Sequence, residues 1–236
     1  MSELLQMESP QPAQRSLDRR SVRTRASLRR ALAAEIVAAG DLSQVTVTAV
    51  TDRAGVTRRT FYSHYRDIPD LVDRIERDCI VELSGYVAAI SAVHQTELES
   101  AISRFDACPG VEELLNYFKT RGSHLGALLG EGGDPAFAEK IMRMVRDVVT
   151  PRAAEGLDLE VLGPIFDYYL TYAISAETGV LVRWLTGGMK EPVGTMARVM
   201  TALMFVRPGD LYGRTIDFKI PDAALELIRI KGEKHD

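Results

Sequence analysis

The sequence has little of several features on which other classes of protein depend. Only two cysteines, Cys79 and Cys108, occur among 236 residues and no C-x-x-C pair is present, which excludes a disulfide framework, a zinc ribbon and a thioredoxin-type site. No apolar stretch approaches the roughly 18 residues that span a bilayer. The first fourteen residues are acidic and contain two prolines, whereas a signal peptide needs a basic patch and an apolar run. We therefore expect a cytoplasmic protein with no membrane partner.

The residues of known catalytic and metal sites are also missing. The four histidines are scattered, without a His-x-x-x-His or Glu-x-x-His pair that would hold a metal ion. Gly130-Glu131-Gly132-Gly133 lacks the Lys-Ser/Thr pair of a phosphate-binding loop, and no Gly-x-Ser-x-Gly elbow is present. We expect neither an enzyme nor a bound metal or cofactor.

The charge is distributed unevenly along the chain. The formal net charge is −4, but the segment from Arg15 to Arg66 contains eleven arginines, no lysine and four acidic residues, a net of +7. The 170 residues that follow carry −9. Because phosphate attraction depends on local charge within a Debye length of about 10 Å, this basic segment is a candidate for binding nucleic acid.

Apolar residues recur with helical spacing along most of the chain, so we expect an all-α fold. Leu28, Leu32 and Ile36 lie at i, i+4 and i+8, which predicts a first helix that begins near Val22 and ends at Gly40. Residues 1–20 are predicted to be a disordered arm that carries both acidic and basic side chains.

Two short helices follow, each with a threonine as its N-cap. Thr46 is expected to cap a helix that ends at Gly55, and Thr57 to cap a helix over residues 58–64. Two short helices joined by a tight turn form a helix-turn-helix, whose second helix enters the major groove of DNA. We therefore assign residues 21–66 to a three-helix DNA-binding domain.

The remaining part, residues 67–236, is predicted to be a larger helical bundle that binds an effector and dimerises. Its first expected helix starts at Ile68. The next four are expected over Val111–Leu129, Pro135–Val149, Leu162–Trp184 and Pro192–Leu203, the second of them ending before Pro151. An extended loop over residues 207–220 is expected to precede a last short helix.

Arg58 and Arg59 carry the chemistry that reads DNA sequence. A guanidinium group can donate two hydrogen bonds to O6 and N7 of guanine, which discriminates against other bases by about 1–3 kcal/mol. Threonine, tyrosine and histidine side chains can bond phosphate oxygens and fix the register. The alternative interpretation of the same residues is a basic helix face that is merely solvated.

The order of the residues from Val45 to Leu71 resembles the DNA-binding region of the tetracycline-repressor (TetR) family of bacterial regulators. The most specific matches are Ala54-Gly55-Val56 and Thr60-Phe61-Tyr62-x-His64-Tyr65. With the preceding helix, the resemblance covers about residues 22–75. A second stretch, from Tyr168 to Leu185, resembles the penultimate helix of many family members.

The resemblance implies roles for particular residues. Those expected to face the groove, its walls or the phosphates are Thr46, Thr48, Thr57, Arg58, Arg59, Thr60, Tyr62, Ser63 and His64. Phe61 and Tyr65 are assigned to a small core with Val50 and Leu32. Three positions differ from the common family pattern. Arg59 stands where many members have glycine, Thr51 where a small alanine usually packs, and Ile68 where a lysine is frequent.

The resemblance also implies a homodimer and an effector pocket in the C-terminal helices. The expected interface consists of Phe166, Tyr169, Ala173, Ala176, Val180, Trp184, Val193, Met196 and Met200. The residues expected to line the pocket are His124, Phe137, Tyr168 and Tyr172. The leading hypothesis is a ligand-responsive homodimeric repressor that binds double-stranded DNA at a pseudo-palindromic operator. The alternative is an all-helical interaction module or enzyme with a solvated basic N-terminal segment.

Overall fold

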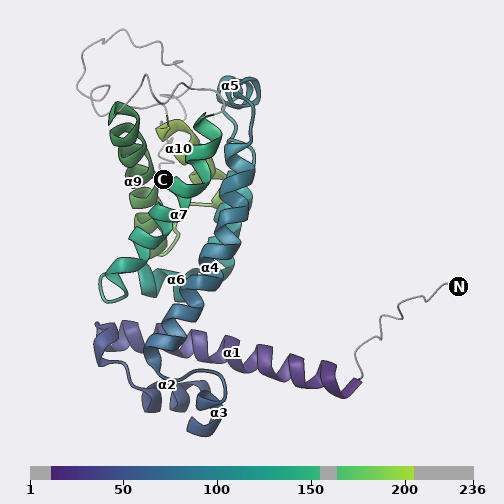
Figure 1. Cartoon of the computed structure of the whole chain (residues 1–236), viewed down its shortest axis with the longest axis vertical. Helices are drawn as coiled ribbons and strands as arrows, with labels where there is room; N and C mark the ends of the chain where they lie inside the picture. The colour runs from purple at the N-terminus through teal and green to yellow at the C-terminus, as the bar shows by residue number, and fades with distance from the viewer. Residues whose placement is uncertain (1–11, 155–163, 205–236) are drawn as a thin grey trace, which may run out of the picture. The chain divides into compact units, whose positions relative to one another are not determined.

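The computed structural model describes residues 12–154 and 164–204, and every regular element in these ranges is helical (Figure 1). The elements are α1 (Pro12–Ala39), the 3-10 helix η1 (Leu42–Gln44), α2 (Val47–Ala54), α3 (Arg58–Tyr62), α4 (Ile68–Ser91), α5 (Gln95–Ser103), α6 (Val111–Leu129), α7 (Pro135–Ala154), α9 (Pro164–Thr186) and α10 (Val193–Leu203). The chain forms two compact units, Met1–Ile75 and Glu76–Asp236, and the division falls inside α4. The predicted domain boundary at residues 66 and 67 lies just before α4 and stays a prediction.

In the first unit, α1 packs against α2 and α2 against α3. The core contains Leu32 of α1, Val50 of α2, Phe61 of α3 and Tyr65 after it, all at most 3% exposed, as the sequence predicts. Burial of these apolar side chains stabilises the unit by about 25 cal/mol per Å² of surface removed from water. It holds α1, α2 and α3 together.

The first helix begins ten residues before its predicted start. The expected start near Val22 and the expected disordered arm over residues 1–20 are wrong for residues 12–20, which belong to α1. Pro12 occupies the first position, where its missing N–H costs no helical hydrogen bond. Between residues 19 and 27 no side chain is buried, so these turns carry no buried apolar stripe from which the helix could be recognised.

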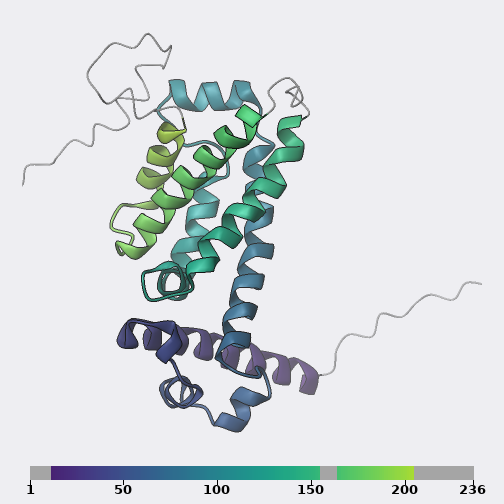
Figure 2. The ribbon, with the colours of Figure 1, turned by 60° about the vertical axis from the view of Figure 1, so that its left-hand side comes forward.

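In the second unit, α6 contacts α7, α9 and α10, so it lies at the centre of the bundle. Figure 2 shows α9 and α10 side by side, joined by the turn that begins at Gly187. The predicted bounds of α6 are confirmed, and α10 begins at Val193, directly after its cap Pro192. The segment over residues 207–220 and the start of the helix predicted from Leu162 lie outside the described residues.

Two helices of this unit differ from the sequence prediction. Helix α7 continues to Ala154 through Pro151, although we expected it to stop at Val149. Proline removes one N–H donor, and in the last turn of a helix this loss affects a single hydrogen bond. Helix α5 was not predicted; it starts after His94, whose backbone N–H donates to the Glu97 carboxylate at 3.2 Å.

Candidate nucleic-acid interface

The first element of the interface is α2, which begins at a side-chain cap as predicted. The hydroxyl of Thr46 accepts a hydrogen bond from the backbone N–H of Ala49 at 3.2 Å. Thr51 lies one turn further on, is 1% exposed, and donates its hydroxyl to the carbonyls of Val47 and Thr48. These bonds satisfy a buried polar group, which explains how a threonine replaces the smaller alanine of the family pattern.

The turn between α2 and α3 depends on Gly55. Its φ of 66° and ψ of 33° are left-handed, a conformation that glycine adopts without the steric cost that other residues meet. Its N–H reaches the carbonyls of Thr51 and Asp52, and the N–H of Val56 also bonds Thr51 at 3.1 Å. The chain reverses here, and α3 begins three residues later.

Helix α3 begins at Thr57, the second predicted cap. The Thr57 hydroxyl accepts from the N–H of Thr60 at 3.1 Å and lies 2.9 Å from the Thr60 hydroxyl. The helix ends at Tyr62, two residues before the predicted end at His64, although the backbone N–H groups of His64 and Tyr65 still bond the carbonyl of Phe61.

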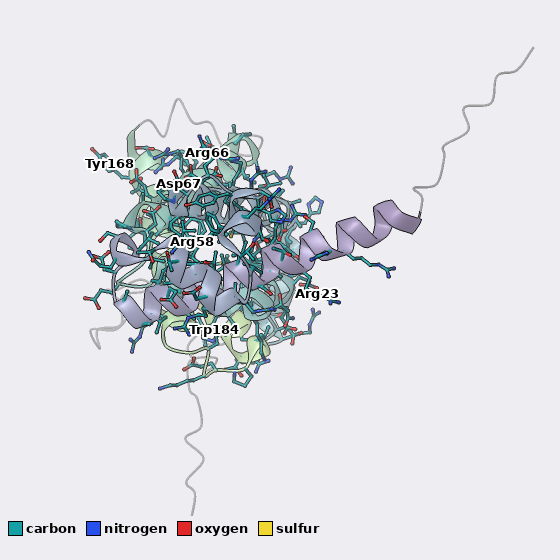
Figure 3. All side chains as sticks on the ribbon, turned by 90° about the horizontal axis from the view of Figure 1, so that it is seen from below. Arg23, Arg58, Arg66, Asp67, Tyr168 and Trp184 are labelled. Carbon is teal, nitrogen blue, oxygen red and sulfur yellow. The ribbon has the colours of Figure 1, made fainter. Side chains whose placement is uncertain are left out.

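Two buried aromatic rings anchor α3 and turn its other side outward. Phe61 is 0% exposed, and its ring centroid lies 5.7 Å from that of Tyr65, which is 3% exposed. By contrast, Arg58 and Arg59 are exposed and Tyr62 is 58% exposed (Arg58 is labelled in Figure 3). The helix therefore presents two guanidinium groups and a phenol on a fixed frame, the donors that groove and phosphate recognition require.

The other predicted DNA-binding residues also lie in the first unit. Thr46, Thr48, Thr57 and Ser63 are exposed, and Thr60 and His64 are half-buried. The hydroxyl of Ser63 donates to the carbonyl of Thr60 at 2.7 Å, and the Thr46 and Thr57 hydroxyls are occupied by their capping bonds. Each hydroxyl keeps an acceptor lone pair or a proton for a further contact.

Nearby arginines differ in whether their charge is already used. Arg53 of α2 forms an ion pair with Glu35 of α1, and Arg66 pairs with Asp70 at 3.3 Å. A hydrogen bond from the backbone N–H of Arg66 lowers the pKa of Asp70, so this carboxylate remains charged. Within residues 12–154 and 164–204, neither Arg58 nor Arg59 has an ion-pair partner. The sequence could not show the pair of Arg53 and Glu35, because these residues lie 18 positions apart.

Comparison with known families identifies the chain. A profile described as bacterial regulatory proteins, tetR family, matches residues 30–75, and a second, described as the C-terminal region of a transcriptional regulator of the TetR type, matches residues 106–205. The chain belongs to the TetR family. This is a family of DNA-binding transcriptional regulators and not of enzymes. The predicted family, all-α fold and helix-turn-helix are thereby confirmed.

One curated relative matches part of the chain. It is described as an uncharacterized HTH-type transcriptional regulator, YxbF, of Bacillus subtilis (strain 168), and is 29% identical over 89 residues. The match covers 37% of this TetR-family chain and 23% of the relative, less than two thirds of the relative's length. No solved structure matches the chain significantly.

The residues predicted to line an effector pocket differ in their exposure. Phe137 of α7 is 0% exposed and His124 of α6 is half-buried, but Tyr168 and Tyr172 of α9 are 75% and 50% exposed. Among the described residues these tyrosines therefore lie on a surface and not in an interior pocket. A hollow of about 720 Å³ is found elsewhere, between α5 and the start of α6, and contains none of the four.

The predicted dimer residues divide into two sets. Trp184, Val193, Met196 and Met200 are at most 8% exposed, so their stripe packs inside the second unit itself, and the Trp184 ring N–H donates to the carbonyl of Glu191 at 3.2 Å. Their assignment to an interface is corrected, because the single chain already covers them. Tyr169 and Ala176 are exposed, and Phe166, Ala173 and Val180 are half-buried, so these residues remain available.

No helix in the described ranges is long and apolar enough to cross a membrane. The same ranges contain no group of three or more His, Cys, Asp or Glu side chains with an arrangement that could hold a metal ion.

Proposed function

We propose that this TetR-family chain is a homodimeric repressor that reads a DNA operator with α3. The observation that carries the proposal is the pair of exposed arginines, Arg58 and Arg59, which have no ion-pair partner among the described residues and lie on a helix held in place by buried Phe61 and Tyr65. A rigid helix matters because a bidentate arginine contact needs the guanidinium plane to match the base edge. Thr48 and Tyr62 supply the hydroxyls that would bond the phosphates beside the groove.

Dimerisation is proposed through the exposed face of α9. This face carries Tyr169, Ala176 and Gly179, and a Cβ atom built on Gly179 meets nothing within 4 Å. Small residues allow the backbone of a second helix to approach closely, and exposed tyrosines provide large apolar contact areas. A twofold dimer presents two copies of α3, so the operator is expected to be pseudo-palindromic, with half-sites about 34 Å or one DNA turn apart.

Control by an effector is the third part of the proposal. A small molecule bound in the second unit would favour a state in which the two recognition helices no longer match the half-sites. The ligand must prefer this state by several kcal/mol, since a ligand with equal affinity for both states shifts nothing. We place this function in the cytoplasm, where duplex DNA is available.

Selection from a random pool of DNA duplexes tests the proposal. The purified protein should enrich one pseudo-palindromic sequence, and sedimentation should show a dimer at micromolar concentration. A variant with Arg58→Ala and Arg59→Ala serves as the matched control and should enrich no sequence. The proposal is rejected if the wild-type protein enriches no duplex, or if it enriches the same sequence as this variant.

A further inference from the structure

The N-terminal part of α1 precedes the residues that the family profile matches. The family profile begins at residue 30, whereas α1 begins at Pro12, so residues 12–29 add about 27 Å of helix at 1.5 Å per residue. Figures 1 and 2 agree that this part of α1 runs past α2 and α3, the other α-helices that lie wholly within the first unit. We call residues 12–29 the α1 extension.

The α1 extension is strongly basic. It contains six arginines and a single acidic residue, Asp18. Arg19, Arg20, Arg23 and Arg25 are exposed (Arg23 is labelled in Figure 3), and no residue of the described chain pairs with these four side chains. By contrast, the arginines of α2 and of the turn before α4 are paired with Glu35 and Asp70. The unpaired charge is therefore concentrated on the α1 extension and on α3.

Packing within the chain does not account for this charge. Between residues 19 and 27 no side chain is fully buried, and Val22 is 58% exposed. The side chains of these turns are therefore not part of the core of the unit. Arg19 and Arg23 stand at i and i+4, a spacing at which like charges on a helix destabilise it by a few tenths of a kcal/mol. A polyanion alongside the helix would reverse the sign of this interaction.

We propose that the α1 extension is a second DNA-binding element, which lies along the phosphate backbone outside the half-site read by α3. This inference rests on the proposed function. The partner is duplex DNA and not an acidic protein, because the α1 extension and α3 belong to one compact unit, so DNA held by α3 brings a regular row of phosphates near this unit. Duplex DNA carries one charge per 1.7 Å of axis, so a helix of about 27 Å finds more phosphates than its arginines can neutralise.

The contact is sequence-independent and should appear as salt dependence. Each neutralised phosphate adds about 0.9 to the slope of log affinity against log salt. If all four exposed arginines make contact, the slope per protomer is lower by about 3 to 4 in their absence. Between about 50 and 200 mM salt, the affinity of the wild-type protein should then fall roughly 100-fold more, per protomer bound, than that of a protein without these charges.

The test compares two full-length variants with the wild type on the selected operator embedded in flanking DNA. One variant changes Arg19, Arg20, Arg23 and Arg25 to alanine, which favours helix and removes the charge; the other changes the same residues to lysine, which retains it. The alanine variant should show the lower slope with an unchanged preferred sequence, and the lysine variant should remain close to the wild type. Circular dichroism confirms that both variants keep their helices.

The outcomes separate this inference from the proposed function. If the wild-type protein selects an operator and the alanine variant shows the same slope and affinity, the α1 extension does not touch DNA and the inference is wrong while the function stands. If the alanine variant loses its sequence preference, the arginines act in reading and the backbone assignment is wrong. If the lysine variant behaves like the alanine variant, charge is not the cause and the inference is again overturned.

Discussion

Burial of Glu76 in the second unit should make the stability of this unit fall as the pH rises. The Glu76 side chain is 2% exposed, its Oε2 accepts from the Lys140 ammonium at 2.5 Å, and its Oε1 has no partner in the described part of the chain. Lys140 also lies 3.3 Å from Asp134, so two carboxylates share one ammonium group. Burial raises the pKa of Glu76 from 4.5 to about 7, because the ammonium group only partly offsets the lost hydration.

The sign and size of the effect follow from proton linkage. Between pH 4.5 and about 7, the folded state binds a proton at Glu76 that the unfolded state has released. The free energy of unfolding therefore decreases as the pH rises through this window, by at most about 3 kcal/mol at 1.36 kcal/mol per pKa unit. Glutamine at position 76 resembles the protonated acid and cannot ionise. The stability of the Glu76→Gln variant relative to the wild type should thus increase from pH 5 to pH 8.

Urea unfolding at pH 5 and pH 8 tests this prediction. The fluorescence of Trp184, the one tryptophan of the chain, reports on the unit that contains Glu76. Glu139 is exposed and pairs with Arg143, so the Glu139→Gln variant is the control. Its free energy of unfolding should differ from that of the wild type by less than about 1 kcal/mol at either pH. The reasoning is refuted if wild type and Glu76→Gln differ by the same free energy at both values. Glu177, whose pKa burial also raises to about 7, leaves a residual slope in both proteins.

Three further predictions concern DNA binding, assembly and the turn. Arg58→Ala or Arg59→Ala should relax the base preference at one position in each half-site and reduce the binding free energy by about 1–3 kcal/mol per contact, whereas Tyr62→Phe should weaken binding to all sites equally. Titration against singly substituted operators measures both effects. Folded arginine variants with wild-type base preference would contradict the groove-facing assignment. Ala176→Glu should give monomers in sedimentation, because a charge buried without a partner is costly; a dimer of unchanged affinity would move the interface elsewhere. Gly55→Ala should destabilise the first unit by about 1 kcal/mol in urea unfolding followed by circular dichroism, since its φ of 66° disfavours a side chain; unchanged stability would show that the turn relaxes.

The sequence predicted best those elements whose signals are local. Thr46 and Thr57 were recognised as caps because a threonine before a helical pattern can bond the N–H three residues later, and both bonds are present. Phe61 was assigned to the core because of its spacing from other apolar residues, and it is fully buried. These features need no knowledge of distant parts of the chain, so the helix-turn-helix was predictable almost residue by residue.

The misses have a different physical origin. Periodicity identifies a helix through its buried face, and residues 19–27 of α1 have none, so the predicted start of the helix is too late. The sequence pattern predicts that the helix stops before Pro151, but a proline in the last turn removes only one hydrogen bond from α7. Both errors concern the ends of helices, where tertiary contacts no longer constrain the pattern.

The predicted interface shows why a mostly apolar helix cannot be oriented from its sequence alone. Trp184 and Tyr169 of α9 share one apolar stripe in the sequence, yet the first is 3% and the second 61% exposed. The Trp184 ring is buried, and its N–H donates to the carbonyl of Glu191. This contact depends on the turn to α10 and not on helical spacing. The buried part of the stripe therefore stabilises the fold of one chain, and only the exposed part, around Tyr169 and Ala176, is free to join two chains. In the proposed dimer, assembly and folding would depend on different residues of the same helix, so a substitution at Ala176 should separate the subunits without unfolding either of them.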